Sequence, residues 1–147
     1  MKLTIWILFF ALLACNSITT GDHLSNEDIK RIQQMGLLEK DEQILKFYSE
    51  FKHSVAGNFY SNQRLASYWQ DEHDQSKNTI NPAFYTDIIS IDTVCNAGVT
   101  NSPYMLVMQK DSSTFKVCFD GNLEEIRRTF TEAINIWKNK KTQTQKQ

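Results

Sequence analysis

Apolar and polar positions alternate in short runs over most of the chain, and this pattern predicts a sheet-rich domain. The clearest run is 56–69, where aromatic residues flank a polar turn at 61–63, so we predict a β-hairpin there. Further strands are predicted from alternating or short apolar runs at 44–51, 79–85, 87–95, 104–109 and 114–119. In the run 44–51, the alternation places Leu45, Phe47 and Phe51 on one face.

Two segments with helical spacing flank the strands. Ser25 is placed to cap a short helix that ends at Gly36. Asn122 is placed to cap a longer helix. Its apolar stripe is Leu123, Ile126, Phe130, Ile134 and Trp137. The predicted fold is therefore mainly β with helices (α+β): a small antiparallel barrel or sandwich, preceded by a short helix and capped by a C-terminal amphipathic helix.

The N-terminus has the features of an export signal. Lys2 is followed by an apolar run at 3–13, which is shorter than the roughly 20 residues of a membrane-spanning helix. The run leads into Leu12-Leu13-Ala14-Cys15, which resembles the lipobox of bacterial lipoproteins, although a residue smaller than Leu13 is commoner at its position. The resemblance implies cleavage before Cys15 and acylation of that residue by diacylglycerol and a fatty acid such as palmitate. The alternative is an ordinary secretory signal followed by a chance cysteine.

These features divide the chain into four parts. We expect a signal peptide at 1–14, a lipidated tether at 15–24, the domain at 25–138 and a disordered tail at 139–147. In the enterobacterial sorting pattern, Asn16 after the acylated cysteine implies the outer membrane, with the domain facing the periplasm.

Composition and motifs exclude several classes of function. The net charge of −1 gives no reason to expect a nucleic-acid partner. The chain has no phosphate-binding glycine loop, zinc-protease motif or nucleophile elbow, so we expect neither enzymatic activity nor a cofactor. The loop 71–74 holds four side chains of metal-ligand type but lacks the spacing of a calcium loop, so we expect it to be a solvated loop.

Three stretches are similar to pleckstrin-homology (PH)-like domains, including the GRAM-type and bacterial PH-like families. Residues 57–65 match a hairpin of glycine, apolar residues, turn and arginine, 84–91 match a strand leading into Asp-Ile-x-x-Ile, and 115–119 match the last strand before the helix. The resemblance covers roughly 40–140 and implies a domain that binds rather than catalyses. Phosphoinositide-binding members carry a basic cluster between their first two strands. This chain has only Lys52 and His53 there, so we do not expect that ligand.

The candidate site residues are Cys15 for lipidation and an aromatic set for binding, if one face of the hairpin is exposed. This set is Tyr48, Tyr60, Tyr68 and Trp69. Cys95 and Cys118 are either disulfide-bonded or small apolar fillers. The predicted strand 104–109 between them implies a separation of about 9–10 Å, which is beyond disulfide range.

Together, these observations predict an envelope protein held in the bilayer by the Cys15 acyl groups, whose PH-like domain binds a protein partner. The alternative function is a carrier or sensor of a small apolar ligand, held between the sheet and the C-terminal helix. The large side chains of Phe130 and Trp137 on that helix argue for a filled core instead.

Overall fold

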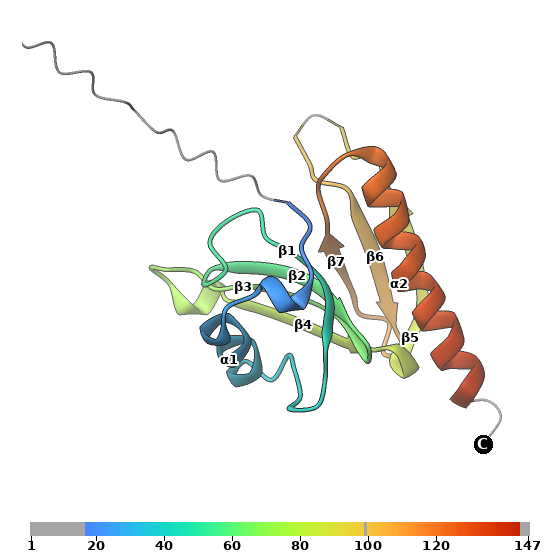
Figure 1. Ribbon diagram of the computed structural model, residues 1–147, viewed down its shortest axis with the longest axis horizontal. Helices are drawn as coiled ribbons and strands as arrows, with labels where there is room; N and C mark the ends of the chain where they lie inside the picture. The colour runs from blue at the N-terminus through green and yellow to red at the C-terminus, as the bar shows by residue number, and fades with distance from the viewer. Residues whose placement is uncertain (1–16, 99, 145–147) are drawn as a thin grey trace, which may run out of the picture.

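The computed structural model describes residues 17–98 and 100–144, and in them seven antiparallel strands form two sheets (Figure 1). The first sheet runs β1 (Ile44–Tyr48), β2 (Ala56–Ser61), β3 (Arg64–Trp69) and β4 (Thr79–Phe84) in that order. The second sheet runs β5 (Ile88–Val94), β6 (Tyr104–Gln109) and β7 (Thr114–Cys118). The helices are α1 (Asn26–Gln34) and α2 (Leu123–Thr144), and the short 3-10 turns are η1 (Gly21–His23), η2 (Gln75–Lys77) and η3 (Tyr85–Asp87). The predicted fold class is confirmed, and the architecture is the one that the PH-like resemblance implies.

The first sheet is covered on both faces, which gives the molecule two apolar clusters. Phe59 packs with Ile32 of α1 on the outer face, while its neighbour Tyr60 faces the second sheet and α2. All six residues of β2 are consequently buried. Alternation along this strand separates two cores rather than a core from solvent.

The predicted hairpin is β2–β3, joined by Asn62 and Gln63. Gly57 lies opposite Tyr68 in the ladder. A Cβ atom on Gly57 would come within 2.4 Å of the Tyr68 ring, so the glycine leaves room for that ring. This contact gives a physical reason for the glycine of the hairpin motif.

The prediction for β1 was wrong in its faces and its length. The pairing with β2 shifts between Ile44 and Lys46, which is the mark of a β-bulge. Phe47 therefore packs in the cluster under α1, whereas Leu45 packs against the cluster between the sheets. The strand ends at Tyr48, and Phe51 lies beyond it in an exposed loop.

The helix α1 begins at the predicted N-cap. The Ser25 hydroxyl accepts a hydrogen bond from the Asp28 backbone N–H at 3.1 Å, and the Asp28 carboxylate accepts one from the Ser25 N–H at 3.3 Å. This reciprocal pair is a capping box. The helix ends before Gly36, which has the left-handed φ of +73° that glycine tolerates best.

We expect Ser25→Ala to lower the free energy of unfolding by about 1 kcal/mol, because one backbone N–H of the first turn loses its acceptor. Denaturant unfolding measures the change. Ser54→Ala, at an exposed position of the β1–β2 loop, is the matched control and should change stability by less than about 0.5 kcal/mol. Equal losses in both variants would contradict the role of the cap.

The predicted tether at 15–24 is too long, because its second half belongs to the folded domain. Thr19 and Phe47 exchange two backbone hydrogen bonds, of 2.9 and 2.8 Å, so residue 19 extends the edge of the first sheet. Leu24 is buried under α1. The lipobox and Cys15 lie outside the described residues.

The predicted tail at 139–147 is also corrected, because α2 continues to Thr144. Lys141 lies 5.2 Å from the ring centroid of Trp137, one turn earlier, and this contact supports the extension. The hydroxyls of Thr142 and Thr144 bond to carbonyls four residues before them, within the helix. Residues 145–147 are not among those described.

Candidate functional site

The four aromatic candidates do not form one surface. Tyr48, Tyr60 and Tyr68 are all buried, and only Trp69, at the end of β3, is exposed. Of the four candidates, only Trp69 can therefore contribute to a binding surface. Tyr68 is buried in the apolar cluster under α1, whereas Tyr48 and Tyr60 are buried in the cluster between the sheets and α2.

Tyr60 ties the first sheet to α2. Its hydroxyl donates a hydrogen bond of 2.8 Å to the Glu132 carboxylate. Burial, followed by the hydrogen bond and charge of Glu132, raises the pKa of the Tyr60 phenol far above its ordinary value. Tyr60 therefore stays protonated at any physiological pH and acts as a structural donor.

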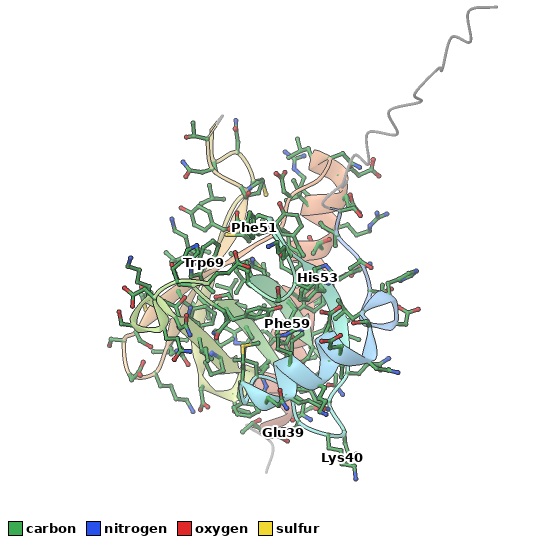
Figure 2. All side chains as sticks on the ribbon, turned by 90° about the vertical axis from the view of Figure 1, so that its left-hand side faces the viewer. Glu39, Lys40, Phe51, His53, Phe59 and Trp69 are labelled. Atoms are coloured by element: carbon green, nitrogen blue, oxygen red, sulfur yellow. The ribbon has the colours of Figure 1, made fainter. Side chains whose placement is uncertain are left out.

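Trp69 lies beside Phe51, a residue that was predicted to end the strand 44–51. The rings of Phe51 and Trp69 lie 6.4 Å apart, and these side chains are 51% and 38% exposed. Figure 2 labels both and shows them near each other, on the side of the molecule that faces the viewer. The Lys52 ammonium lies 5.9 Å from the Phe51 ring and 3.2 Å from Glu72. We call Phe51 and Trp69 the aromatic pair.

Sequence reasoning also missed a buried ion pair. The Arg64 guanidinium donates two hydrogen bonds to Glu42, of 2.9 and 2.7 Å, and the two side chains are only 3% and 0% exposed. Ser61 also donates to this carboxylate, and the arginine stacks 4.0 Å from the Phe84 ring. The pair fastens the segment before β1 to the hairpin, so Arg64 of the hairpin motif has a structural role.

His53 joins the β1–β2 loop to α1. Its Nδ1 lies 3.2 Å from an Asp28 oxygen, and its ring packs edge-on to Phe47 with centroids 4.9 Å apart. Burial raises the pKa of Asp28, but hydrogen bonds from Ser25 and His53 and the His53 charge outweigh it, so the pKa lies below its usual value. These contacts hold the base of the loop that carries Phe51.

Two carboxylates of the acidic loop 71–74 accept hydrogen bonds from their own turns. Asp71 accepts from the backbone N–H groups of His73 and Asp74 at 2.9 and 2.8 Å, and these bonds lower its pKa. Asp74 in turn accepts from Ser76 and caps η2. Asp71 and Asp74 therefore face their own backbone, whereas Glu72 pairs with Lys52.

Cys95 and Cys118 are free thiols in the structure. Cys118 ends β7 opposite Tyr104 of β6, which in turn lies opposite Val94 of β5. A strand thus separates the two cysteines, as the sequence analysis argued. Burial raises the pKa of the Cys118 thiol to about 11.

This pKa predicts slow alkylation of Cys118 at neutral pH, because only the thiolate is nucleophilic. We expect its labelling rate with iodoacetamide to rise about tenfold per pH unit from pH 8 to 10. Peptide mapping by mass spectrometry measures this rate separately for each cysteine. A rate that levels off near pH 9 would contradict the effect of burial.

A cleft of about 390 Å³ lies between the β5–β6 loop and the start of α2. Its lining is largely polar and includes Asn101, Ser102 and Asp120, so it does not suit an apolar ligand. Between the sheets and α2, aromatic rings occupy the space: Phe119 lies 6.0 Å from Tyr60 and 6.2 Å from Phe130. This packing argues against the carrier alternative.

None of the helices in residues 17–98 and 100–144 is long and apolar enough to cross a membrane.

Comparisons with known proteins add little to this picture. No protein-family model matches the chain, and no curated protein does either. Among solved structures, the chain is similar to a crystal structure of a DUF1696 family protein with a pleckstrin-homology domain from Shewanella loihica PV-4. The two are 13% identical, the similarity covers 80% of this chain and 97% of that chain, and the TM-score is 0.48. A likeness at this level carries no argument about function.

Proposed function

We propose that this protein is a bacterial envelope lipoprotein, acylated at Cys15, whose PH-like domain is a protein-interaction module. The observation that carries the proposal is the lipobox Leu12-Leu13-Ala14-Cys15 after a short apolar run, only four residues before the start of the folded domain at Thr19. The sorting pattern at Asn16 favours the outer membrane, with the domain facing the periplasm.

The interaction role is supported by the character of the domain. Its cores are filled with aromatic and aliphatic side chains, and its buried polar groups, such as Glu42 and Arg64, satisfy one another. A domain of this kind is suited to binding other molecules through its surface. The apolar side chains that remain exposed, Phe51 and Trp69 among them, are suited to contact with another molecule.

Intact-mass measurement of the protein extracted from membranes tests the anchor. We expect a chain that begins at Cys15 and carries the added mass of diacylglycerol and a fatty acid. Cys15→Ser is the control and should lose both the acyl mass and membrane retention. A wild-type chain that starts elsewhere and has no acyl mass would overturn the anchor.

Crosslinking in intact cells tests the interaction module. We expect the anchored protein to capture one envelope protein reproducibly, and Cys15→Ser to lose that capture because it no longer reaches the membrane surface. Capture of no protein by the anchored form would overturn the interaction role. In that case, native mass spectrometry would test the carrier alternative by looking for a co-purified ligand.

A further inference from the structure

The aromatic pair lies close, along the chain, to the proposed anchor. From Cys15 to Thr19 the chain spans at most about 14 Å, since an extended residue covers about 3.3–3.6 Å. Thr19 is bonded directly to Phe47, and Phe47 is four residues before Phe51, which adds at most a similar distance. An acylated Cys15 therefore keeps the aromatic pair within a short distance of the bilayer surface.

The arrangement in space agrees with this estimate. In Figure 1 the β1–β2 loop, which carries Phe51, lies at the same end of the molecule as the first described residues. Figure 2, turned by 90°, again shows Phe51 in the upper part of the molecule, with Glu39 and Lys40 at the opposite end. A bilayer at the anchor's end therefore faces the β1–β2 loop, together with the β5–β6 loop and the start of α2, which reach further in the same direction.

Charges around the pair favour apolar contact over attraction to anionic headgroups. The nearby lysines already form ion pairs, Lys52 with Glu72 at 3.2 Å and Lys77 with Asp74 at 3.5 Å. The neighbouring loop adds the ionised Asp71, so this end carries no excess of positive charge. The interaction that this end can make with a lipid surface is therefore apolar contact through the two exposed aromatic side chains.

We propose that the aromatic pair Phe51 and Trp69 inserts into the headgroup region of the membrane that holds Cys15, as a second and apolar contact that fixes the orientation of the domain. This inference rests on the acylation proposed above. Phenylalanine and tryptophan suit such a position, tryptophan in particular because its ring has both an apolar body and a polar N–H.

The anchor makes a weak second contact effective. Two exposed side chains would give little binding to a protein free in solution. Tethering converts their insertion into an intramolecular event with a high effective concentration.

A fixed orientation has a consequence for the rest of the molecule. The end of α2, with Lys138 and Lys141, lies opposite the β1–β2 loop in Figure 1 and is directed away from this bilayer. The start of β5, with the exposed Ile89, also lies at that far end. These surfaces stay open to a protein partner while the aromatic pair is covered by lipid.

Tryptophan fluorescence in reconstituted vesicles tests the proposal. The full-length protein, processed in cells and extracted in detergent, is placed in phosphatidylcholine vesicles that contain a nitroxide lipid quenching at a depth of about 5–10 Å. The chain from Cys15 onward holds only Trp69 and Trp137. We expect quenching of the Trp69 emission, so that Trp69→Phe removes the quenched component and leaves the unquenched emission of Trp137.

Two exposed apolar positions supply a matched pair of variants. Phe51→Ser should reduce the quenching of Trp69, because half of the inserted surface is lost. Ile89→Ser, at a residue that is 47% exposed on the second sheet, should leave the quenching unchanged. Both positions are exposed, so neither change should unfold the domain, and circular dichroism checks this. Adding anionic phosphatidylglycerol should not increase the quenching.

The outcomes separate this inference from the proposed function. If intact mass shows acylated Cys15 but Trp69 is not quenched, the membrane contact is overturned while the lipoprotein stands. Crosslinks from position 51 to a protein in intact cells, without quenching, would assign the pair to a protein partner. Quenching that requires anionic lipid would overturn the apolar contact. An unacylated chain would overturn the anchor and the inference with it.

Discussion

Arg64→Ala is expected to lower the free energy of unfolding by about 3–5 kcal/mol, because it leaves the Glu42 carboxylate buried without its cation. The arginine makes two hydrogen bonds to that carboxylate and one of 3.3 Å to the Gly36 carbonyl. It also covers the Phe84 ring, so its removal takes away packing as well as charge. The midpoint of denaturant unfolding, followed by circular dichroism, measures the loss.

Arg31→Ala is the matched control. Arg31 also pairs with a carboxylate, Asp28 at 3.0 Å, but it is partly exposed on α1, where such a pair contributes about 1 kcal/mol or less. A double variant, Glu42→Leu with Arg64→Met, should lose less stability than Arg64→Ala alone, since no unpaired charge remains. Equal losses for Arg64→Ala and Arg31→Ala would contradict the importance of burial.

This ion pair also shows what the sequence could not reveal. Glu42 and Arg64 are 22 residues apart and each lies among polar neighbours, so both resemble surface charges. Only the folding of the segment before β1 onto the hairpin brings them together and excludes water. A contact of this kind depends on tertiary packing, and one sequence carries no local signal for it.

Local features, in contrast, were predicted well. The β2–β3 hairpin follows from apolar strands around a polar turn, and the caps at Ser25 and Asn122 follow from side chains that accept backbone hydrogen bonds. The faces of β1 were predicted wrongly because a bulge adds one residue to the alternation. Burial of Tyr68 could not be derived, because the sequence does not show that α1 covers the outer face of the first sheet.

The candidate site residues show the same contrast between local features and tertiary structure. Trp69 was named from the sequence as one of the aromatic residues of the hairpin, and it is exposed in the structure. Phe51 was placed in the strand, on one face with Leu45 and Phe47, because it continued the alternation of β1. Its exposure depends on where that strand ends, and element boundaries are the least certain part of a prediction from sequence.

Phe119→Ala is the second variant with a large expected effect, a loss of about 3–5 kcal/mol in the free energy of unfolding. The Phe119 side chain is fully buried where the two sheets and α2 meet. Its ring lies within 6.5 Å of the rings of Tyr48, Tyr60 and Phe130. Alanine would leave a cavity whose lining loses its contacts, and the surrounding side chains would fill it only in part.

Phe51→Ala removes the same ring from an exposed loop and should change stability by less than about 0.5 kcal/mol. The pair of variants also tests whether this core is a ligand site. If the wild-type core is filled, a small apolar molecule such as benzene should stabilise only Phe119→Ala, since only that variant has an empty apolar cavity. Thermal unfolding with and without benzene measures this effect. Equal stabilisation of the wild type would show that the core accepts a ligand, and the carrier alternative would then replace the interaction module as the better account of the domain.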